Sequence, residues 1–247
     1  MKEETLPIYI MYFQEILKQK KKYAEWCDAD FIFYEEDKEW DEFRDHYHSL
    51  FPYATPFDIC QWYSKYLADG LCKKYDEVVY IDFDMIIGNM WLNCFDEWNI
   101  KNGIYIKTDF SNSLEFNFVD KISAQRDIKS YWAHKVCEEL DIEHDAENML
   151  YINTGMFGTN LEHQKKVKFI ETLELTMPIL NQMYINKDTF TTGMRFSNEV
   201  VYMVSYWKNK YKVQHAEKIW HDNPNGNDDM NCAFLHCTNK NYIADYI

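Results

Sequence analysis

The sequence predicts an α/β protein whose mostly parallel, mixed sheet carries helices on both faces. Short apolar runs, rich in β-branched and aromatic residues, alternate with longer stretches in which apolar residues recur at helical spacing. The clearest unit is a helical stretch followed by an apolar run that ends abruptly in two aspartates. A chain of 247 residues is long enough for one large α/β domain with a substantial core.

The amino-terminal region offers two candidate strands. Residues 8–12 are apolar and short enough for a first strand, although residues 11–26 could instead form a helix. The cationic run at 18–22 is typical of a solvated helix face. Residues 30–34 (Asp-Phe-Ile-Phe-Tyr) predict a second strand, with the acidic run 35–41 as its exposed exit.

The region 56–84 contains the most informative pattern. Residues 56–74 predict a helix with apolar side chains on one face, and Val78–Ile81 predicts a buried parallel strand. The strand runs directly into Asp82-Phe83-Asp84, so alternation should send both carboxylates to one side and Phe83 into the core. Paired carboxylates past the carboxyl end of a strand lie where open α/β sheets bind ligands, and their oxygens suit Mg²⁺ or Mn²⁺.

The second half of the chain continues the alternation of strands and helices. The predicted elements are a strand at 103–107 with Asp109 just beyond it, a helix at 127–140, a strand at 151–159 interrupted by Asn153 and Gly155, helices at 161–175 and 198–208, and a last strand at 233–236 that ends in His236.

Composition narrows the class of ligand. The formal net charge of −15 argues against a nucleic-acid or anionic-membrane partner, because binding to phosphate backbones relies on Lys and Arg. Nineteen Tyr and eight Trp supply flat surfaces that can stack on sugars or pack in an ordinary core. Any phosphate on the ligand would need a metal to enter so negative a protein.

The seven cysteines are scattered, and none forms a Cys-x-x-Cys pair. This usage fits a reducing compartment and offers no zinc-ligand spacing. The sequence also has no apolar stretch of signal-peptide or membrane-spanning length. The expectation is a cytoplasmic protein.

In their order, these motifs resemble the GT-A fold glycosyltransferases, particularly the glycogenin-like and bacterial galactosyltransferase (family 8-like) group, over about residues 50–240. The block from Lys65 to Asp84 resembles the family's helix, strand and Asp-x-Asp motif. The resemblance implies that Lys65 contacts the donor and that Asp82, Phe83 and Asp84 form the cofactor motif. A solvent-facing Lys65 paired with Asp69 is the alternative.

The Asn153-Thr154-Gly155 segment resembles the family's Asn-x-Gly strand, in which Gly lets the backbone approach a ligand and Asn bonds sugar hydroxyls. By the same resemblance, Asp109 contacts the donor sugar, with an ordinary loop aspartate as the alternative. Asn198-Glu199 resembles the pair that opens a helix beside the anomeric carbon. Asn198 could equally be the N-cap of that helix.

The segment Phe234-Leu235-His236 resembles the strand whose histidine completes the family's metal site, which His215 and His221 could also supply. The family continues with Gly and Lys-Pro-Trp, whereas this chain reads Cys-Thr-Asn-Lys240. Lys240 is therefore the weakest match to the family's diphosphate-binding lysine.

The resemblance implies one GT-A domain over 1–247, with a nucleotide-sugar-binding half at about 1–110 and an acceptor-binding half at about 111–247. Asp82, Asp84 and His236 would hold Mn²⁺ or Mg²⁺, aided by Lys65 and Lys240. Asp109, Asn153, Asn198 and Glu199 would lie beside the reacting sugar. The implied reaction moves a sugar from a UDP-sugar to a sugar or glycan acceptor, with retention of configuration.

Two other functions stay open. Haloacid-dehalogenase-type phosphatases also carry Asp-x-Asp after an apolar strand, but the motif there continues to Thr or Val where this chain has Ile86. The departure after His236 also leaves a non-catalytic module that binds nucleotide sugars or glycans.

Overall fold

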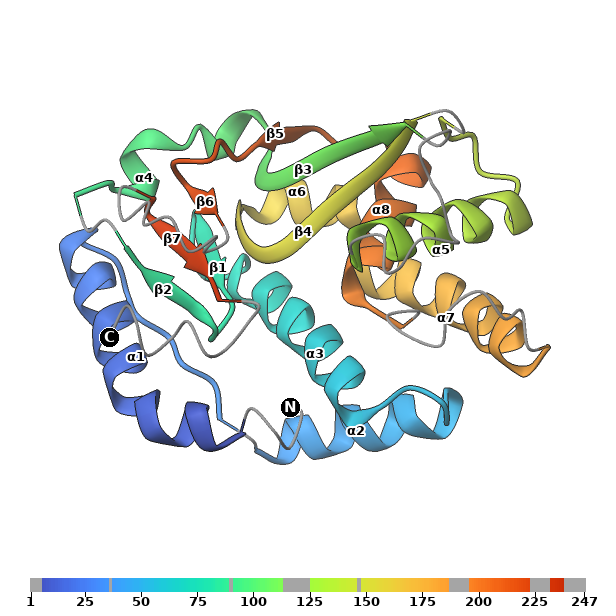
Figure 1. Ribbon diagram of the computed structural model, residues 1–247, viewed down its shortest axis with the longest axis horizontal. Helices are drawn as coiled ribbons and strands as arrows, with labels where there is room; N and C mark the ends of the chain where they lie inside the picture. Colours follow the sequence, from blue (N-terminus) through green and yellow to red (C-terminus); the bar gives the residue numbers. More distant parts are fainter. Residues whose placement is uncertain are drawn as a thin grey trace.

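The computed structural model describes residues 6–35, 37–88, 91–112, 125–145, 148–186, 196–222 and 232–237, and it has the predicted mixed α/β architecture (Figure 1). The helices are α1 (Leu6–Trp26), α2 (Lys38–Leu50), α3 (Pro56–Leu71), α4 (Cys94–Glu97), the 3₁₀ turn η2 (Ile100–Asn102), α5 (Gln125–Glu139), α6 (Leu161–Val167), α7 (Phe169–Ile185) and α8 (Asn198–Asn209). The strands are β1 (Val78–Ile81), β2 (Met85–Ile87), β3 (Ile104–Asn112), β4 (Asn148–Thr159), β5 (Val213–His215), β6 (His221–Asp222) and β7 (Phe234–His236).

The larger sheet has the strand order β1-β4-β3-β5. Both β1 and β3 pair antiparallel with β4, while β5 pairs parallel with β3. Three strands therefore run in one direction, with β4 reversed between two of them. The strand before the two aspartates is antiparallel to its neighbour and mostly half-buried, which corrects the expectation of a buried parallel strand.

The smaller sheet has the order β2-β7-β6, in which β7 pairs antiparallel with β2 and parallel with β6. Its strand β2 follows β1 after a short turn, so the turn joins the two sheets. The carboxyl end of β7 lies opposite the start of β2, since His236 pairs with Met85.

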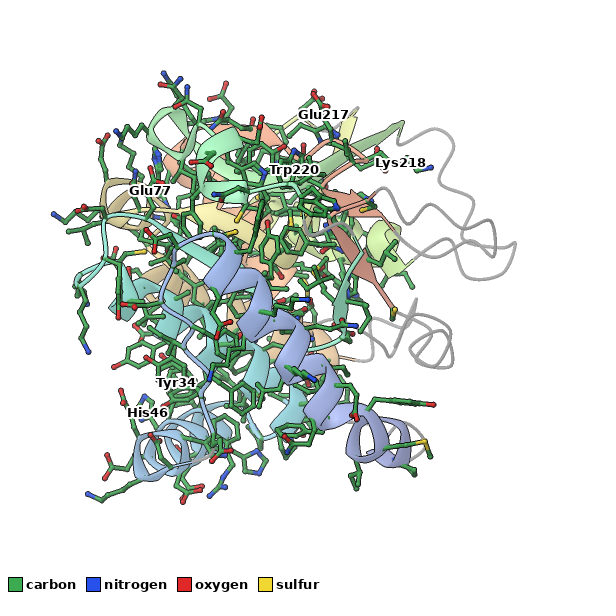
Figure 2. The ribbon with its side chains drawn as sticks, turned by 90° about the vertical axis from the view of Figure 1, so that its left-hand side faces the viewer. Tyr34, His46, Glu77, Glu217, Lys218 and Trp220 are labelled. Carbon is green, nitrogen blue, oxygen red and sulfur yellow. The ribbon has the colours of Figure 1, made fainter. Side chains whose placement is uncertain are left out.

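Helices pack at both ends of the molecule (Figure 1). Helices α5 and α8 pack on β4 and on each other, and α7 packs on α8. Helix α1 runs along β2 and crosses the face that Figure 2 turns toward the viewer. Trp220, labelled there, packs with Trp98 and Phe234 in an apolar cluster beside the smaller sheet, whereas Glu217 and Lys218 lie at the edge of the molecule.

The predictions of two amino-terminal strands are wrong. Residues 8–12 belong to α1, and residues 30–34 form neither strand nor helix. Buried residues in and just after α1 recur at Ile16, Lys20, Tyr23 and Cys27, a helical period that the short apolar run at its start does not show.

Two smaller differences concern where predicted elements end. The predicted helix 161–175 divides into α6 and α7 at Lys168, whose left-handed φ of 51° ends the first helix. Strand β3 extends to Asn112, so Asp109 lies within it rather than beyond its end. Within the described residues, no helix is both long and apolar enough to cross a bilayer.

The other predicted elements are confirmed with small shifts at their ends. They are α3, β1, α5, β4, α8 and β7.

Candidate metal centre

The turn between β1 and β2 carries both aspartates of the Asp-x-Asp motif. The backbone N–H of Asp82 donates to the carbonyl of Gly155 at 2.6 Å, and that of Met85 donates to the carbonyl of Asp82 at 3.1 Å. Phe83 is half-buried and stacks on Phe13, with the ring centroids 5.3 Å apart. The motif is thus a hydrogen-bonded turn with an apolar anchor.

His236 meets this turn from the end of β7. One ligand atom each from Asp82, Asp84 and His236 lie within 4.8 Å of one another, and all three residues are half-buried. The Nε2 atom of His236 lies 3.6 Å from Oδ1 of Asp84. Two carboxylates and one imidazole are a suitable ligand set for Mn²⁺, so the structure confirms that these three residues come together.

Behind His236 lies His221, which is fully buried on β6. Its Nε2 atom is 3.3 Å from Nδ1 of His236. Burial, together with the neighbouring His236, lowers the pKa of His221 well below its ordinary value. His221 therefore supports His236 instead of replacing it as a ligand. His215, the other rival, hydrogen-bonds Thr108 on β3.

Lys65 is buried beneath the turn, which corrects the alternative of a solvent-facing lysine. Its Nζ donates to the carbonyl of Thr154 at 2.9 Å, lies 3.4 Å from the centre of the Tyr80 ring, and is 3.8 Å from Oδ1 of Asp82. Burial lowers the pKa of Lys65 to about 8, against the opposing charge of Asp82. The Lys65 side chain is only 1% exposed, so it supports the aspartate turn from the interior of the protein.

Lys20 is a second buried lysine at the turn. The sequence prediction that residues 18–22 form a solvated helix face is therefore wrong for Lys20. Its Nζ donates to the carbonyls of Asp82 and Met85, at 2.8 and 2.7 Å. Burial lowers the pKa of Lys20 to about 8, while the charges of Asp84 and Asp82 oppose the shift. Its spacing from Ile16 and Tyr23 on the buried face is the signal that could have revealed it.

The Asn-x-Gly motif of β4 borders the metal cluster. Asn153 Oδ1 accepts from the N–H of Gly155 at 2.9 Å, and its Nδ2 donates to the hydroxyl of Tyr151 at 3.1 Å. A Cβ atom on Gly155 would lie 3.0 Å from Cε1 of His236. The glycine therefore permits the close approach of the strand and the histidine.

Two of the remaining predicted site residues, Asn198 and Glu199, lie at the start of α8. Ser197 is the N-cap of α8, which corrects that role for Asn198; Asn198 instead accepts from Thr154 Oγ1 at 3.2 Å. Buried Glu199 accepts from the hydroxyl of Tyr151 at 3.0 Å and forms an ion pair with Lys129.

Asp109 lies directly across β3–β4 from Tyr151, so the two side chains share one face of the sheet. Lys240 falls outside the described residues.

Comparisons with known proteins add a distant likeness. No family model matches the sequence. No curated protein matches it either. Among solved structures, mouse xyloside xylosyltransferase 1 in its apo form aligns with a TM-score of 0.42 and 11% identity, over 81% of this chain and 72% of that chain. Function is therefore inferred from the side chains that the fold brings together.

Proposed function

We propose that the protein is a metal-dependent glycosyltransferase that moves a sugar from a nucleotide sugar, most simply a UDP-sugar, to a sugar or glycan acceptor with retention. The observation that carries this proposal is the meeting of Asp82, Asp84 and His236 at the junction of the two sheets. The family resemblance of the same residues in the sequence supports it.

The reaction requires negative charge to be stabilised on the departing diphosphate and positive charge on the sugar. A divalent cation bound by Asp82, Asp84 and His236 would supply Lewis-acid help worth several kcal/mol. Lys20 and Lys65 hold the backbone around the aspartates, which fixes the geometry of the carboxylates before substrate arrives. Lys240 remains a proposed diphosphate contact.

The polar groups along β4 would orient the sugar. Asn153 and Tyr151 form a hydrogen-bonded row that leads from Gly155 to Glu199. Asp109 lies on the same face, and Asn198 is tied to β4 through Thr154. Holding donor and acceptor in line is the contribution expected of these residues.

The geometry is less suited to a phosphatase of the haloacid-dehalogenase type. That mechanism needs the first aspartate as a free nucleophile. Here Asp82 Oδ1 already accepts from the hydroxyl of Tyr80 and lies beside the Lys65 ammonium. A carboxylate oxygen that already accepts a hydrogen bond and lies beside a cation is a weaker nucleophile than a free one.

The test is release of UDP from a panel of UDP-sugars, measured with Mn²⁺ and with EDTA. Asp84→Asn should lose most turnover and keep its melting temperature, because the change removes charge at a half-buried position but little packing. Asp69→Asn is the matched control. Asp69 lies outside the metal cluster and pairs with Lys73, with 3.5 Å between Oδ2 and Nζ.

Turnover that survives EDTA and Asp84→Asn would contradict the proposal. Mn²⁺-dependent binding of the UDP-sugar without release of UDP would identify a non-catalytic module. Release of inorganic phosphate from phosphate esters would identify the phosphatase.

A further inference from the structure

Two buried lysines, Lys20 and Lys65, contact the aspartate turn, and the mostly buried Lys129 lies near enough to feel the charge of Asp82. Their ammonium groups have different partners. Lys20, Lys65 and Lys129 each lie close enough to Asp82 for its charge to raise their pKa against the effect of burial. Lys20 and Lys65 donate to backbone carbonyls and so hold the turn and β4. Lys129, on α5, instead pairs with the carboxylate of Glu199.

The carboxylate of Glu199 is occupied on both oxygens. Its Oε1 accepts from the Tyr151 hydroxyl at 3.0 Å, and its Oε2 accepts from Ser197 Oγ at 3.2 Å and pairs with Lys129. The side chain is 7% exposed. A carboxylate with three such partners is a poor base or nucleophile, so Glu199 acts here as an anchor for Lys129.

Lys129 lies along the same polar row as the Asn-x-Gly motif. Its Nζ is 5.9 Å from the centre of the Tyr151 ring, and Tyr151 bonds Asn153, which in turn bonds Gly155 beside His236. Its side chain is 12% exposed, compared with 1% for Lys65. Lys129 is therefore the more exposed of these two lysines and the better placed to meet a ligand.

A nearby ammonium would add to the attraction that a bound metal offers a diphosphate. The carboxylates of Asp82 and Asp84 partly offset the charge of a divalent ion held between them, so a further cation would strengthen that attraction. An ammonium has three N–H donors, so Lys129 keeps donors for a further acceptor beside its pairing with Glu199.

We propose that Lys129 is a substrate-binding residue that donates to an anionic oxygen of the nucleoside diphosphate beside the metal cluster, with Glu199 as its positioning partner. This inference rests on the proposed function. It assigns the role of the accessible phosphate-binding cation to a helix α5 residue in place of Lys65.

The experiment is calorimetric titration of UDP and of uridine, each with saturating Mn²⁺, into the wild type and Lys129→Met. Loss of a charge-assisted hydrogen bond should weaken UDP binding about tenfold or more. Uridine binding and Mn²⁺ affinity should change less than about twofold, because neither involves the lysine. Lys135→Met, on the surface of the same helix, is the control and should bind UDP as the wild type does.

A second variant separates binding from folding. Lys129→Met leaves Glu199 buried and unpaired, so Lys129→Met with Glu199→Gln removes both charges and keeps an oxygen for Tyr151 to donate to. If this double variant keeps the wild-type melting temperature and loses UDP binding, the proposal is supported.

Three results would overturn it. Wild-type UDP affinity in the double variant would show that Lys129 does not bind the diphosphate. An equal loss of UDP, uridine and Mn²⁺ binding in both variants would show the same, and neither result would contradict the proposed function. A wild-type protein that binds no UDP with Mn²⁺ defeats this inference and the proposed function together.

Discussion

His236 presents its two ring nitrogens to different partners, and this decides how it can serve a metal. Its Nε2 faces Asp84, and its Nδ1 faces Nε2 of His221. A ligand nitrogen must be unprotonated, so a metal on Nε2 requires the proton on Nδ1, where His221 can accept it. Burial lowers the pKa of His221 and keeps it neutral for that role.

We therefore expect His221→Phe to weaken Mn²⁺ binding about 10- to 100-fold, the range typical of a lost outer-shell partner. His221→Gln should restore much of the affinity, because its side-chain oxygen can accept at the position of Nε2. Mn²⁺ titration and melting curves measure both. Equal Mn²⁺ affinity in the wild type and His221→Phe would show that His221 only fills space.

At the scale of elements, β4 is the strand on which the site depends. Between the pairs Ile106–Phe157 and Lys107–Asn153, the register with β3 shifts and leaves Thr154, Gly155 and Met156 out of that pairing. The carbonyl of Thr154 accepts from Lys65, and that of Gly155 accepts from Asp82. The bulge thus leaves the carbonyls of β4 free to contact the aspartate turn and Lys65, and bulges are common beside functional sites.

Gly155→Ala tests this close approach. The added Cβ would lie 3.0 Å from Cε1 of His236 and 3.1 Å from Oδ1 of Asn153, so His236 must shift and Mn²⁺ affinity should fall. Gly70→Ala is the matched control: apart from its chain neighbours and the local backbone of α3, no atom lies within 4 Å of the added Cβ. Alanine at this position in α3 should stabilise the protein by up to about 1 kcal/mol. Unchanged Mn²⁺ affinity in Gly155→Ala would show that β4 does not limit the position of His236.

The sequence predicted elements well where the pattern is local and long. The helix α3 and the strand β4 follow from periodicity, and the meeting of Asp82, Asp84 and His236 follows from the family resemblance of their motifs. The prediction failed where the structure of a segment depends on an element distant in the sequence. The first apolar run suits a strand or a helix equally, and the antiparallel partner of β1 lies far away along the chain.

Buried lysines show the same limit. Lys20 lies in a cationic run that suggests a solvated face, and its burial depends on the carbonyls of a turn more than 60 residues away. Lys129 likewise has no local signal in the sequence, because its partner Glu199 is on another helix. Polar residues on buried faces are justified only by tertiary contacts, which no local pattern encodes.

At the scale of the whole molecule, buried histidine makes folding stability depend on pH. Burial, with His144 adjacent, lowers the pKa of His134 to about 4, although Glu138 and Asp145 oppose the shift and Lys135 adds to it. The unfolded state, with a pKa near 6.5, then binds more protons between about pH 4 and 6.5. The stability from neutral His134 is therefore present above pH 6.5 and lost as the pH falls toward 4.

We expect this term to remove about 2 kcal/mol of stability between pH 7 and pH 5. His134→Leu should show a flatter dependence over that interval in chemical unfolding experiments. His46→Leu, at an exposed position on α2 (Figure 2), should keep the wild-type slope. A His134→Leu protein with the wild-type slope would place the acid sensitivity elsewhere.

The net charge of −15 gives the central claim its most direct test. So acidic a protein should repel a bare diphosphate, and only a cation held by Asp82, Asp84 and His236 should reverse that. The measurement is calorimetric titration of UDP into the wild type with Mn²⁺ and again in EDTA. We expect saturable binding with Mn²⁺ and no heat in EDTA. Equal UDP affinity under both conditions would contradict a metal-bridged nucleotide site.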